Sequence, residues 1–198
     1  MTHSPLQEAG AVAVRPGKRE RLVAAAVQLI HRQGIERTTL AEIAELADVR
    51  PGNVFYYFKT KDDVVAAVVE AHTQQVRATL AAITSAHRSP KARLKALVHD
   101  LAGKSEIVAR YGCPSGSLSS EIDKRADASD FAVADLMLSI IDWAEGQFRE
   151  MGHSGDAREL AIDLLAAYQG NALLTNTMRD PKILSGAARR LDRWIDAL

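Results

Sequence analysis

The stretch that decides the fold reads TTLAEIAELADVRPGNVFYYFKTK and spans residues 38–61. Thr39 stands three residues before Glu42, the spacing of a capping box, and predicts a helix of about nine residues. A tight turn and a second short helix from Pro51 complete the lengths of a helix-turn-helix. The small side chain of Ala44 would let the second helix cross close above the first. By shape alone, an ordinary corner between two helices fits equally well.

Polar residues around the second helix favour a nucleic-acid interface. If Val54 and Phe58 point into the core, the outer face of this helix carries a glycine, which permits close approach, and polar side chains that can form hydrogen bonds to bases or phosphates. Phosphate donors flank this face, in side chains and at two helix N-termini. The residues that these arguments select are Thr38, Thr39, Gly52, Asn53, Tyr56, Tyr57, Lys59 and Lys61.

Charge is distributed unevenly along the chain. The 198 residues carry 25 Lys/Arg and 25 Asp/Glu, so the formal net charge is zero. Residues 1–61 hold nine basic and six acidic residues, whereas the remainder holds 16 and 19. A basic N-terminal part attached to an acidic body suits a polyanionic partner for the first part. The net charge of solvated helix faces often varies by a similar amount, so this asymmetry alone decides nothing.

Apolar residues recur at helical spacing to the C-terminus, so we expect an all-α fold of about nine helices. Residues 1–17 contain two prolines and two glycines and are typical of a flexible arm. Ser89-Pro90 and Asp180-Pro181 each resemble an N-cap followed by proline at the first helical position. The expected helices cover 18–33, 39–47, 51–58, 61–86, 90–110, 117–126, 128–151, 155–179 and 181–197.

Composition excludes several classes of protein. No apolar run approaches the roughly 18 residues that cross a bilayer, and no signal-peptide pattern opens the chain. The single cysteine, Cys113, excludes an internal disulfide framework and suits a reducing cytosol. A lone cysteine is more often a small buried hydrophobe than a redox sensor. No histidine pair or Cys/His cluster indicates a metal, and we predict neither metal nor cofactor.

The segment TTLAEIAELADVRPGNVFYYFKTKDDVVAAVVE resembles the DNA-binding module of the TetR family of bacterial transcriptional regulators. The family pattern is roughly T-T-x-x-x-I-A-x-x-A-G-V-x-x-G-x-L-Y-x-H-F-x-x-K-x-x-L, and the likeness spans residues 18 to about 65. It implies a helix-turn-helix DNA-binding domain at 18–64 and a ligand-binding and dimerisation domain at 65–198. The expected protein is a cytoplasmic bacterial homodimer, nucleoid-associated when bound, that represses from a palindromic operator until a small effector releases it.

The same resemblance assigns roles within the module. Thr39 and Lys61 would hold phosphates, and the reading surface would consist of Arg50, Pro51, Gly52, Asn53 and Tyr56. Three positions depart from the pattern. Asp48 replaces the glycine of the turn and would adopt a left-handed conformation. Phe55 replaces the usual tyrosine and Tyr57 the usual histidine, so we expect Phe55 and Phe58 to anchor the helix while Tyr56 and Tyr57 face the DNA.

A second unusual segment, RYGCPSGSLSSEID at 110–123, reads either as a connector or as part of a ligand site. It resembles the G-C-P-x-G-x-L element of a TetR subgroup that includes antibiotic- and flavonoid-responsive efflux repressors. We expect a pocket within residues 61–151 for an uncharged or aromatic ligand, although most lining candidates could equally be plain core. The candidates are Leu97, Leu101, Ile107, Tyr111, Cys113, Leu118, Met137, Ile141, Trp143 and Phe148.

Residues 155–197 are apolar enough to need cover on more than one side. Burial within one chain would satisfy part of them, and the family resemblance favours a four-helix bundle shared by two chains. The predicted interface residues are Ala166, Ala167, Gly170, Leu173, Leu174, Leu184, Ala188, Leu191, Trp194 and Ile195.

A helical small-molecule-binding protein or an enzyme with a purely structural helix-turn-helix is the alternative. We find no nucleophile–base pair, phosphate loop or metal cluster in the sequence, so we do not expect an enzyme.

Overall fold

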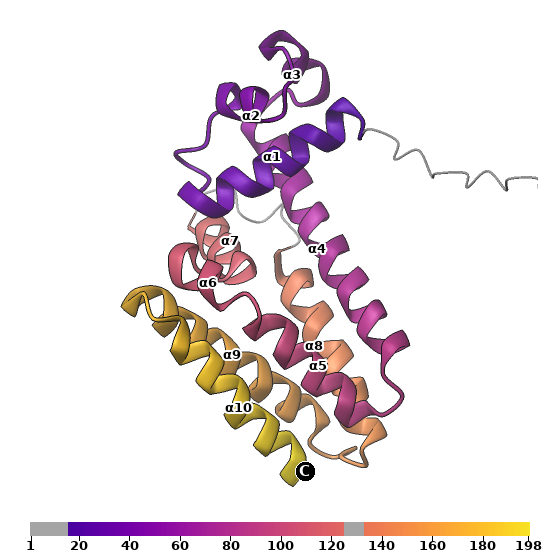
Figure 1. Ribbon diagram of the computed structural model, residues 1–198. Coiled ribbons are helices and arrows are strands. Elements are labelled where there is room, and N and C mark those ends of the chain that lie inside the picture. The colour runs from indigo at the N-terminus through magenta and orange to yellow at the C-terminus, as the bar shows by residue number, and fades with distance from the viewer. Residues whose placement is uncertain (1–15, 125–132) are drawn as a thin grey trace, which may run out of the picture.

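The computed structural model describes residues 16–124 and 133–198, and within these ranges all regular structure is α-helical (Figure 1). The expected all-α class is therefore confirmed. The helices are α1 (Lys18–Gln33), α2 (Leu40–Leu46), α3 (Pro51–Tyr57), α4 (Lys61–Ala86), α5 (Pro90–Ala102), α6 (Ser105–Tyr111), α7 (Pro114–Asp123), α8 (Val133–Glu150), α9 (Ala157–Met178) and α10 (Pro181–Ala197).

Some helix bounds differ from the prediction. The helix expected over 90–110 is divided into α5 and α6, because Gly103 caps α5 and the chain turns there. Helix α7 begins at Pro114 instead of 117, since proline is favoured at a first helical position. The expected start at 128 and most of the N-terminal arm lie outside the described residues.

Side-chain caps explain where several helices begin. The Thr39 hydroxyl accepts a hydrogen bond from the Glu42 N–H, and Thr60 makes the equivalent bond with Asp63 before α4. Ser89 caps α5 and Asp180 caps α10, each followed by proline, as the sequence predicted. Such a cap stabilises a helix by about 1 kcal/mol, so these starts are encoded locally.

The helices form a small module at one end and a larger bundle at the other (Figure 1). Helices α1, α2 and α3 make up the module, and the long α4 runs from it along the body. Helix α9 packs between α8 and α10, and α5 packs against α8 and α10. Helices α6 and α7 lie where the module meets the bundle (Figure 1). No helix among the described residues is long and apolar enough to cross a membrane.

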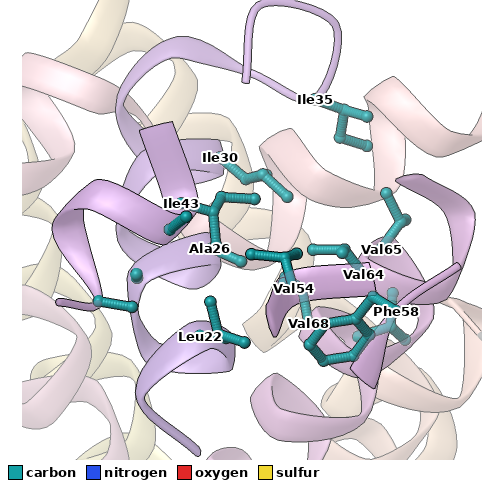
Figure 2. Packing of buried hydrophobic residues seen from close by; sticks show 14 of the residues in the cluster. Leu22, Ala26, Ile30, Ile35, Ile43, Val54, Phe58, Val64, Val65 and Val68 are labelled. Atoms are coloured by element: carbon teal, nitrogen blue, oxygen red, sulfur yellow. The ribbon is translucent and has the colours of Figure 1, made fainter. Parts of the chain in front are cut away.

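The module has its own hydrophobic core, seen in Figure 2. Leu22, Ala26 and Ile30 project from α1 toward Ile43 and Val54 of the two short helices. The start of α4 closes this core, and α7 contributes to it as well, since Leu118 and Ile122 are buried in the same cluster. The predicted domain boundary at 64 falls inside the continuous α4, so the division into two domains remains a prediction.

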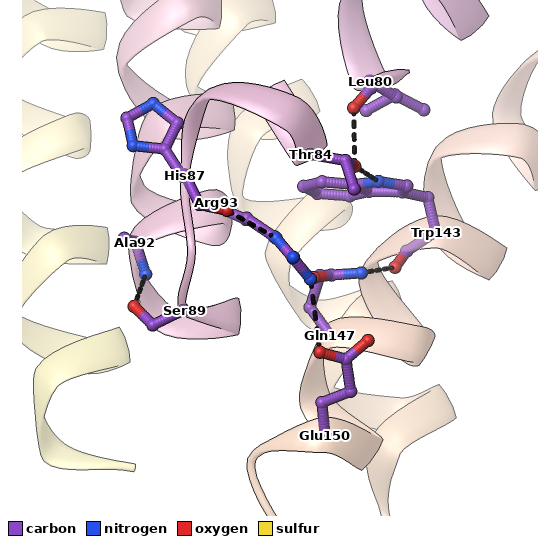
Figure 3. A network of polar contacts seen from close by, with 9 residues as sticks. All are labelled: Leu80, Thr84, His87, Ser89, Ala92, Arg93, Trp143, Gln147 and Glu150. Carbon is purple, nitrogen blue, oxygen red and sulfur yellow. Dashed lines mark hydrogen bonds and ion pairs between the residues drawn. The ribbon is translucent and has the colours of Figure 1, made fainter. Parts of the chain in front are cut away.

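A polar network fastens the far end of α4 to the bundle (Figure 3). The Arg93 guanidinium donates to the His87 carbonyl at 2.9 Å and to the Gln147 side chain at 3.1 Å. The Trp143 indole N–H donates to the Thr84 hydroxyl at 3.0 Å. Helices α4, α5 and α8 are therefore joined by directional contacts at this end, as well as by apolar packing.

Candidate functional site

The turn between α2 and α3 is held from α1. The Arg21 guanidinium donates to the carbonyl of Ala47 at 2.8 Å and to that of Asp48 at 3.2 Å. Asp48 has φ 53°, so the left-handed conformation expected at this position is confirmed. The Val49 N–H donates to the Ala44 carbonyl at 2.9 Å and closes the turn. These contacts fix the orientation of α3 relative to α1 and α2.

The four consecutive aromatic residues at the end of α3, Phe55 to its C-cap Phe58, divide differently from the prediction. Phe58 is 3% exposed and Tyr57 is half-buried against the module core, whereas Phe55 is 55% and Tyr56 78% exposed. The prediction that Phe55 anchors the helix is wrong, and Tyr57 faces outward less than expected. Successive helical residues turn by about 100°, which brings the third residue after buried Val54 close to the same face and the first well away from it.

The start of α3 is open to solvent. Arg50, Pro51 and Gly52 are exposed and Asn53 is half-buried, while Val54 is buried beneath them. A Cβ atom added to Gly52 would meet nothing within 4 Å. Gly52 also lacks a positive φ, so neither backbone geometry nor packing in this chain requires glycine there.

Carboxylates of the chain occupy the N-termini of α2 and α4. The Thr39 N–H and hydroxyl both donate to Glu42, at 2.9 and 2.8 Å, and the Thr60 N–H donates to Asp63 at 2.9 Å. The backbone bond from Thr39 lowers the pKa of Glu42, and that from Thr60 lowers the pKa of Asp63. Both carboxylates stay ionised at neutral pH and preorganise the exposed helix starts.

Thr38 is not a surface residue. Its side chain is 2% exposed, and its hydroxyl donates to the Gly34 carbonyl at 2.7 Å. The prediction that it contacts DNA is therefore wrong for this conformation. The sequence shows two adjacent threonines, and nothing in their type distinguishes the one that turns inward.

Two lysines lie beside the exposed face of α3. The Lys59 ammonium donates to the Phe55 carbonyl at 2.8 Å, and the Lys61 ammonium donates to the Glu36 carbonyl at 2.8 Å. Both bonds lie at the protein surface, so a stronger anionic acceptor could replace either carbonyl.

A cavity of about 100 Å³ lies within the body, between α4, α5, α8, α9 and the start of α7. Three of the predicted pocket residues line it: Leu97, Leu101 and Cys113. Sequence reasoning missed His72, Ser115, Tyr168 and Gln169, which supply polar groups there. A tyrosine inside the strongly apolar 157–178 segment was the available signal for one of them.

The other predicted pocket residues do not line this cavity. Ile107 is exposed, Tyr111 stacks edge-on against His31, and Leu118 belongs to the module core. Phe148 is fully buried against Trp194. Met137, Ile141 and Trp143 are partly buried beside the bundle core. Helical spacing marks such residues as inward-facing, but their distance from a cavity depends on tertiary packing.

Two polar pairs join the cavity wall to the start of α7. A His72 ring nitrogen lies 3.1 Å from the Ser115 hydroxyl, and the Tyr168 hydroxyl donates to the Cys113 thiol at 3.7 Å. Burial, reinforced by the charges of His31 and Lys104, lowers the pKa of His72, so its neutral form is favoured. Burial also raises the pKa of Tyr168, which keeps the phenol protonated. The His72 and Tyr168 side chains thus present uncharged hydrogen-bonding groups to the cavity, whose lining also contains the paired charges of Lys104 and Asp100.

The predicted dimer residues fall into two groups. On α9, Ala166, Gly170, Leu173 and Leu174 are exposed and Ala167 is half-buried. On α10, Leu184, Ala188 and Ile195 are buried within the chain, and Leu191 and Trp194 are half-buried. The three buried residues are a correction, because the periodicity of α10 identified a covered face that α5, α8 and α9 already cover. Sequence reasoning missed Ile162 and Met178, which are exposed on α9.

The described part of the chain contains no group of three or more His, Cys, Asp or Glu residues arranged to hold a metal ion.

Known proteins match the N-terminal module in sequence and most of the chain in fold. A family profile described as "Bacterial regulatory proteins, tetR family" matches residues 22–68. The HTH-type transcriptional regulator BetI of Rhizobium meliloti is 32% identical over 87 residues, 44% of this chain and 43% of the relative. TtgR of Pseudomonas putida, also an HTH-type transcriptional regulator, is 37% identical over 65 residues, 31% of each chain.

Solved structures extend the likeness through the body. A TetR transcriptional regulator from Legionella pneumophila superposes with a TM-score of 0.80 at 21% identity, covering 91% of this chain and 98% of that chain. One from Chloroflexus aurantiacus gives 0.78 at 21% identity, covering 90% and 94%. In sequence, by contrast, the chain spans about half the length or less of the curated relatives it matches. The N-terminal module is therefore similar in sequence to the DNA-binding module of the TetR family of bacterial regulatory proteins, and the fold of the described chain is similar to that of solved TetR regulators.

Proposed function

We propose that this protein is a sequence-specific DNA-binding transcriptional regulator that acts as a homodimer. In this proposal it represses from a palindromic operator and is released by a small uncharged or aromatic effector. The observation that carries the proposal is the exposed start of α3, where Gly52 serves no need of the fold. A surface that remains small and polar without a structural reason suits close approach of another molecule.

The exposed face of α3 supplies groups suited to a DNA groove. Arg50 and Asn53 can form hydrogen bonds to base edges, and Gly52 lets the backbone approach. Tyr56 is largely exposed and can donate to a phosphate oxygen. Exposed Phe55 adds an apolar surface for a thymine methyl group or a sugar, a role that the sequence did not suggest.

Phosphate contacts would come from the edges of the same face. Thr39 at the start of α2 and Lys61 at the start of α4 bracket α3, and Lys59 follows it directly. Because the Glu42 and Asp63 carboxylates already accept hydrogen bonds at these two helix N-termini, a phosphate would compete with Glu42 for Thr39, and the Lys59 and Lys61 ammonium groups would be the main donors. Backbone contacts of this kind set the position of α3 on the duplex and carry no sequence information by themselves.

A second copy would supply the second reading helix. Exposed apolar residues on α9 offer a surface for pairing, and a two-fold dimer would read half-sites about one turn of DNA, or a multiple, apart. A ligand that fits only the form with displaced reading helices would lower operator affinity. Each tenfold loss requires about 1.4 kcal/mol of preference between the two forms.

Selection of bound duplexes from a random pool tests the proposal directly. We expect enrichment of a palindrome, followed by salt-sensitive retardation of that duplex at nanomolar protein. Weak binding without sequence preference would contradict the proposal and favour a helical binding protein or an enzyme with a structural helix-turn-helix.

Two substitutions should separate phosphate contact from base reading. Lys61→Ala is expected to weaken binding to all duplexes and to reduce the slope of log affinity against log salt by about one unit, because one phosphate contact is lost. Asn53→Ala should instead change sequence preference, since a lost base contact is worth about 1–3 kcal/mol at one position.

Competition assays with the selected duplex and single-base variants, repeated across salt concentrations, distinguish the two effects. Lys182→Ala is a matched control, because this exposed lysine lies on α10 in the body, outside the module and the cavity. Unchanged affinity and preference in both the Lys61 and the Asn53 variants would contradict these assignments.

A further inference from the structure

Two cavities of the body meet at Tyr168. The first is the 100 Å³ cavity beside α4 and α7. The second is a narrow gap between α5, α8, α9 and α10, in which every lining residue except Tyr168 is apolar. The residues that line both are Leu97, Leu101, Ile140, Leu165 and Tyr168.

The hydroxyl of Tyr168 is buried, yet it donates its hydrogen bond to a weak acceptor. The residue is 6% exposed, and among the described residues its hydroxyl donates to the Cys113 thiol at 3.7 Å. Sulfur is a poor acceptor, whereas buried hydroxyls normally find an oxygen or nitrogen partner. Gln169 next to it likewise donates to a sulfur, that of Met137, at 3.8 Å. The cavity therefore contains donors that a stronger acceptor would satisfy better.

We infer that the cavity binds an uncharged, ring-sized molecule whose oxygen accepts the hydrogen bond of Tyr168 in place of the Cys113 thiol. The recognition by Tyr168 does not depend on the proposed function; only the further claim that ligand binding controls DNA affinity rests on it. The ring would lie against Leu97, Leu101 and Leu165, which the two cavities share.

Size and charge restrict the ligand. An apolar cavity of about 150 Å³ accepts benzene, so a cavity of about 100 Å³ must widen by roughly half or more to hold a substituted ring. A carboxylate would lose its hydration beside the apolar wall. Lys104, the one lysine or arginine among the described lining residues, already pairs with Asp100 at 2.7 Å. The Asp100 carboxylate in the same lining would repel an anion, and burial raises the pKa of Tyr168, in keeping with a site that disfavours negative charge.

The bond to be displaced lies next to contacts with the module. The Gly112 carbonyl, one residue before Cys113, lies 3.0 Å from a ring nitrogen of His31 on α1. Further along α7, the Glu121 carboxylate accepts a hydrogen bond from the Ile35 N–H at 2.6 Å. Release of Cys113 from Tyr168 would free the segment that His31 holds, so ligand binding and module position would be linked through residues 112–113.

Three matched probes test recognition without DNA. Acetophenone carries an acceptor oxygen, α-methylstyrene has the same shape with CH₂ in place of that oxygen, and benzoate is the charged analogue. Calorimetric titration of the full chain should give acetophenone about tenfold tighter binding than α-methylstyrene, and benzoate the weakest.

The Tyr168→Phe variant should bring the acetophenone to α-methylstyrene ratio to about one, because it removes the donor and keeps the ring. Tyr111→Phe, outside the cavity, should keep the wild-type ratio, and thermal unfolding of both variants checks that they are folded. Equal binding of the two neutral probes to the wild type, tightest binding of benzoate, an unchanged ratio in Tyr168→Phe or no binding of acetophenone would each overturn the inference.

Coupling is tested separately, on the duplex selected by the protein. Saturating acetophenone should lower the operator affinity of the wild type, and the effect should shrink in His31→Leu while acetophenone binding stays unchanged. An undiminished effect in His31→Leu would overturn the route through residues 112–113. A protein that binds acetophenone as expected but selects no duplex would contradict the proposed function and leave the recognition by Tyr168 standing.

Discussion

Leu173→Glu is expected to give a folded monomer whose affinity for the full palindrome is lower by about 10²–10⁴-fold, the usual gain from joining two binding modules. Leu173 is 67% exposed on α9, and Leu174, Met178 and Ile162 on the same helix are also exposed. A glutamate side chain would remain solvated in the single chain, so the fold should tolerate it. Across a two-fold interface it would be buried without a partner, at a cost of several kcal/mol.

Sedimentation at micromolar protein concentration measures the oligomeric state, and titration of the selected duplex measures the operator affinity. Ala82→Glu serves as the control, because it adds the same charge to an exposed position of another helix, α4. The control should remain dimeric and bind the operator as the wild type does. A Leu173→Glu protein that still sediments as a dimer would show that the exposed face of α9 is not the contact between chains.

Features encoded by neighbouring residues were predictable from the sequence. The capping box at Thr39 depends on residues three positions apart and forms as expected, and a second one forms at Thr60. The left-handed turn at Asp48 also depends on local geometry, although its anchoring by Arg21 of α1 does not. Local spacing was therefore enough to locate the helix-turn-helix and to indicate the family that this module resembles.

Features that depend on packing between distant segments were predicted less well. The apolar stripe of α10 indicated a covered face, but nothing in its spacing revealed that the cover comes from the same chain, so Leu184 and Ile195 were assigned to the wrong contact. The cavity brings together residues as far apart as His72 and Tyr168, and no local pattern links them. Phe55 is different, because its outward position follows from the helical turn per residue measured from Val54.

Gly52→Ala and Gly52→Leu should separate the needs of the fold from those of the partner. In the single chain a side chain at this position meets open space, and the backbone is helical, so removing glycine should stabilise the protein by about 0.5 kcal/mol. Operator affinity should move in the opposite direction. We expect a modest loss for alanine and a loss of about 100-fold or more, roughly 2.7 kcal/mol, for leucine, because the larger side chain would hold α3 away from the groove.

Gly146 on α8 provides a matched control, since it is also a helical glycine around which an added Cβ would meet nothing within 4 Å. Gly146→Leu should leave operator affinity unchanged, and thermal unfolding of all three variants should show no loss of stability. If Gly52→Leu bound the operator as tightly as the wild type, the start of α3 could not be the part of the module that approaches DNA. Stability that rises while affinity falls would instead mean that glycine is kept at this position for a partner outside the chain.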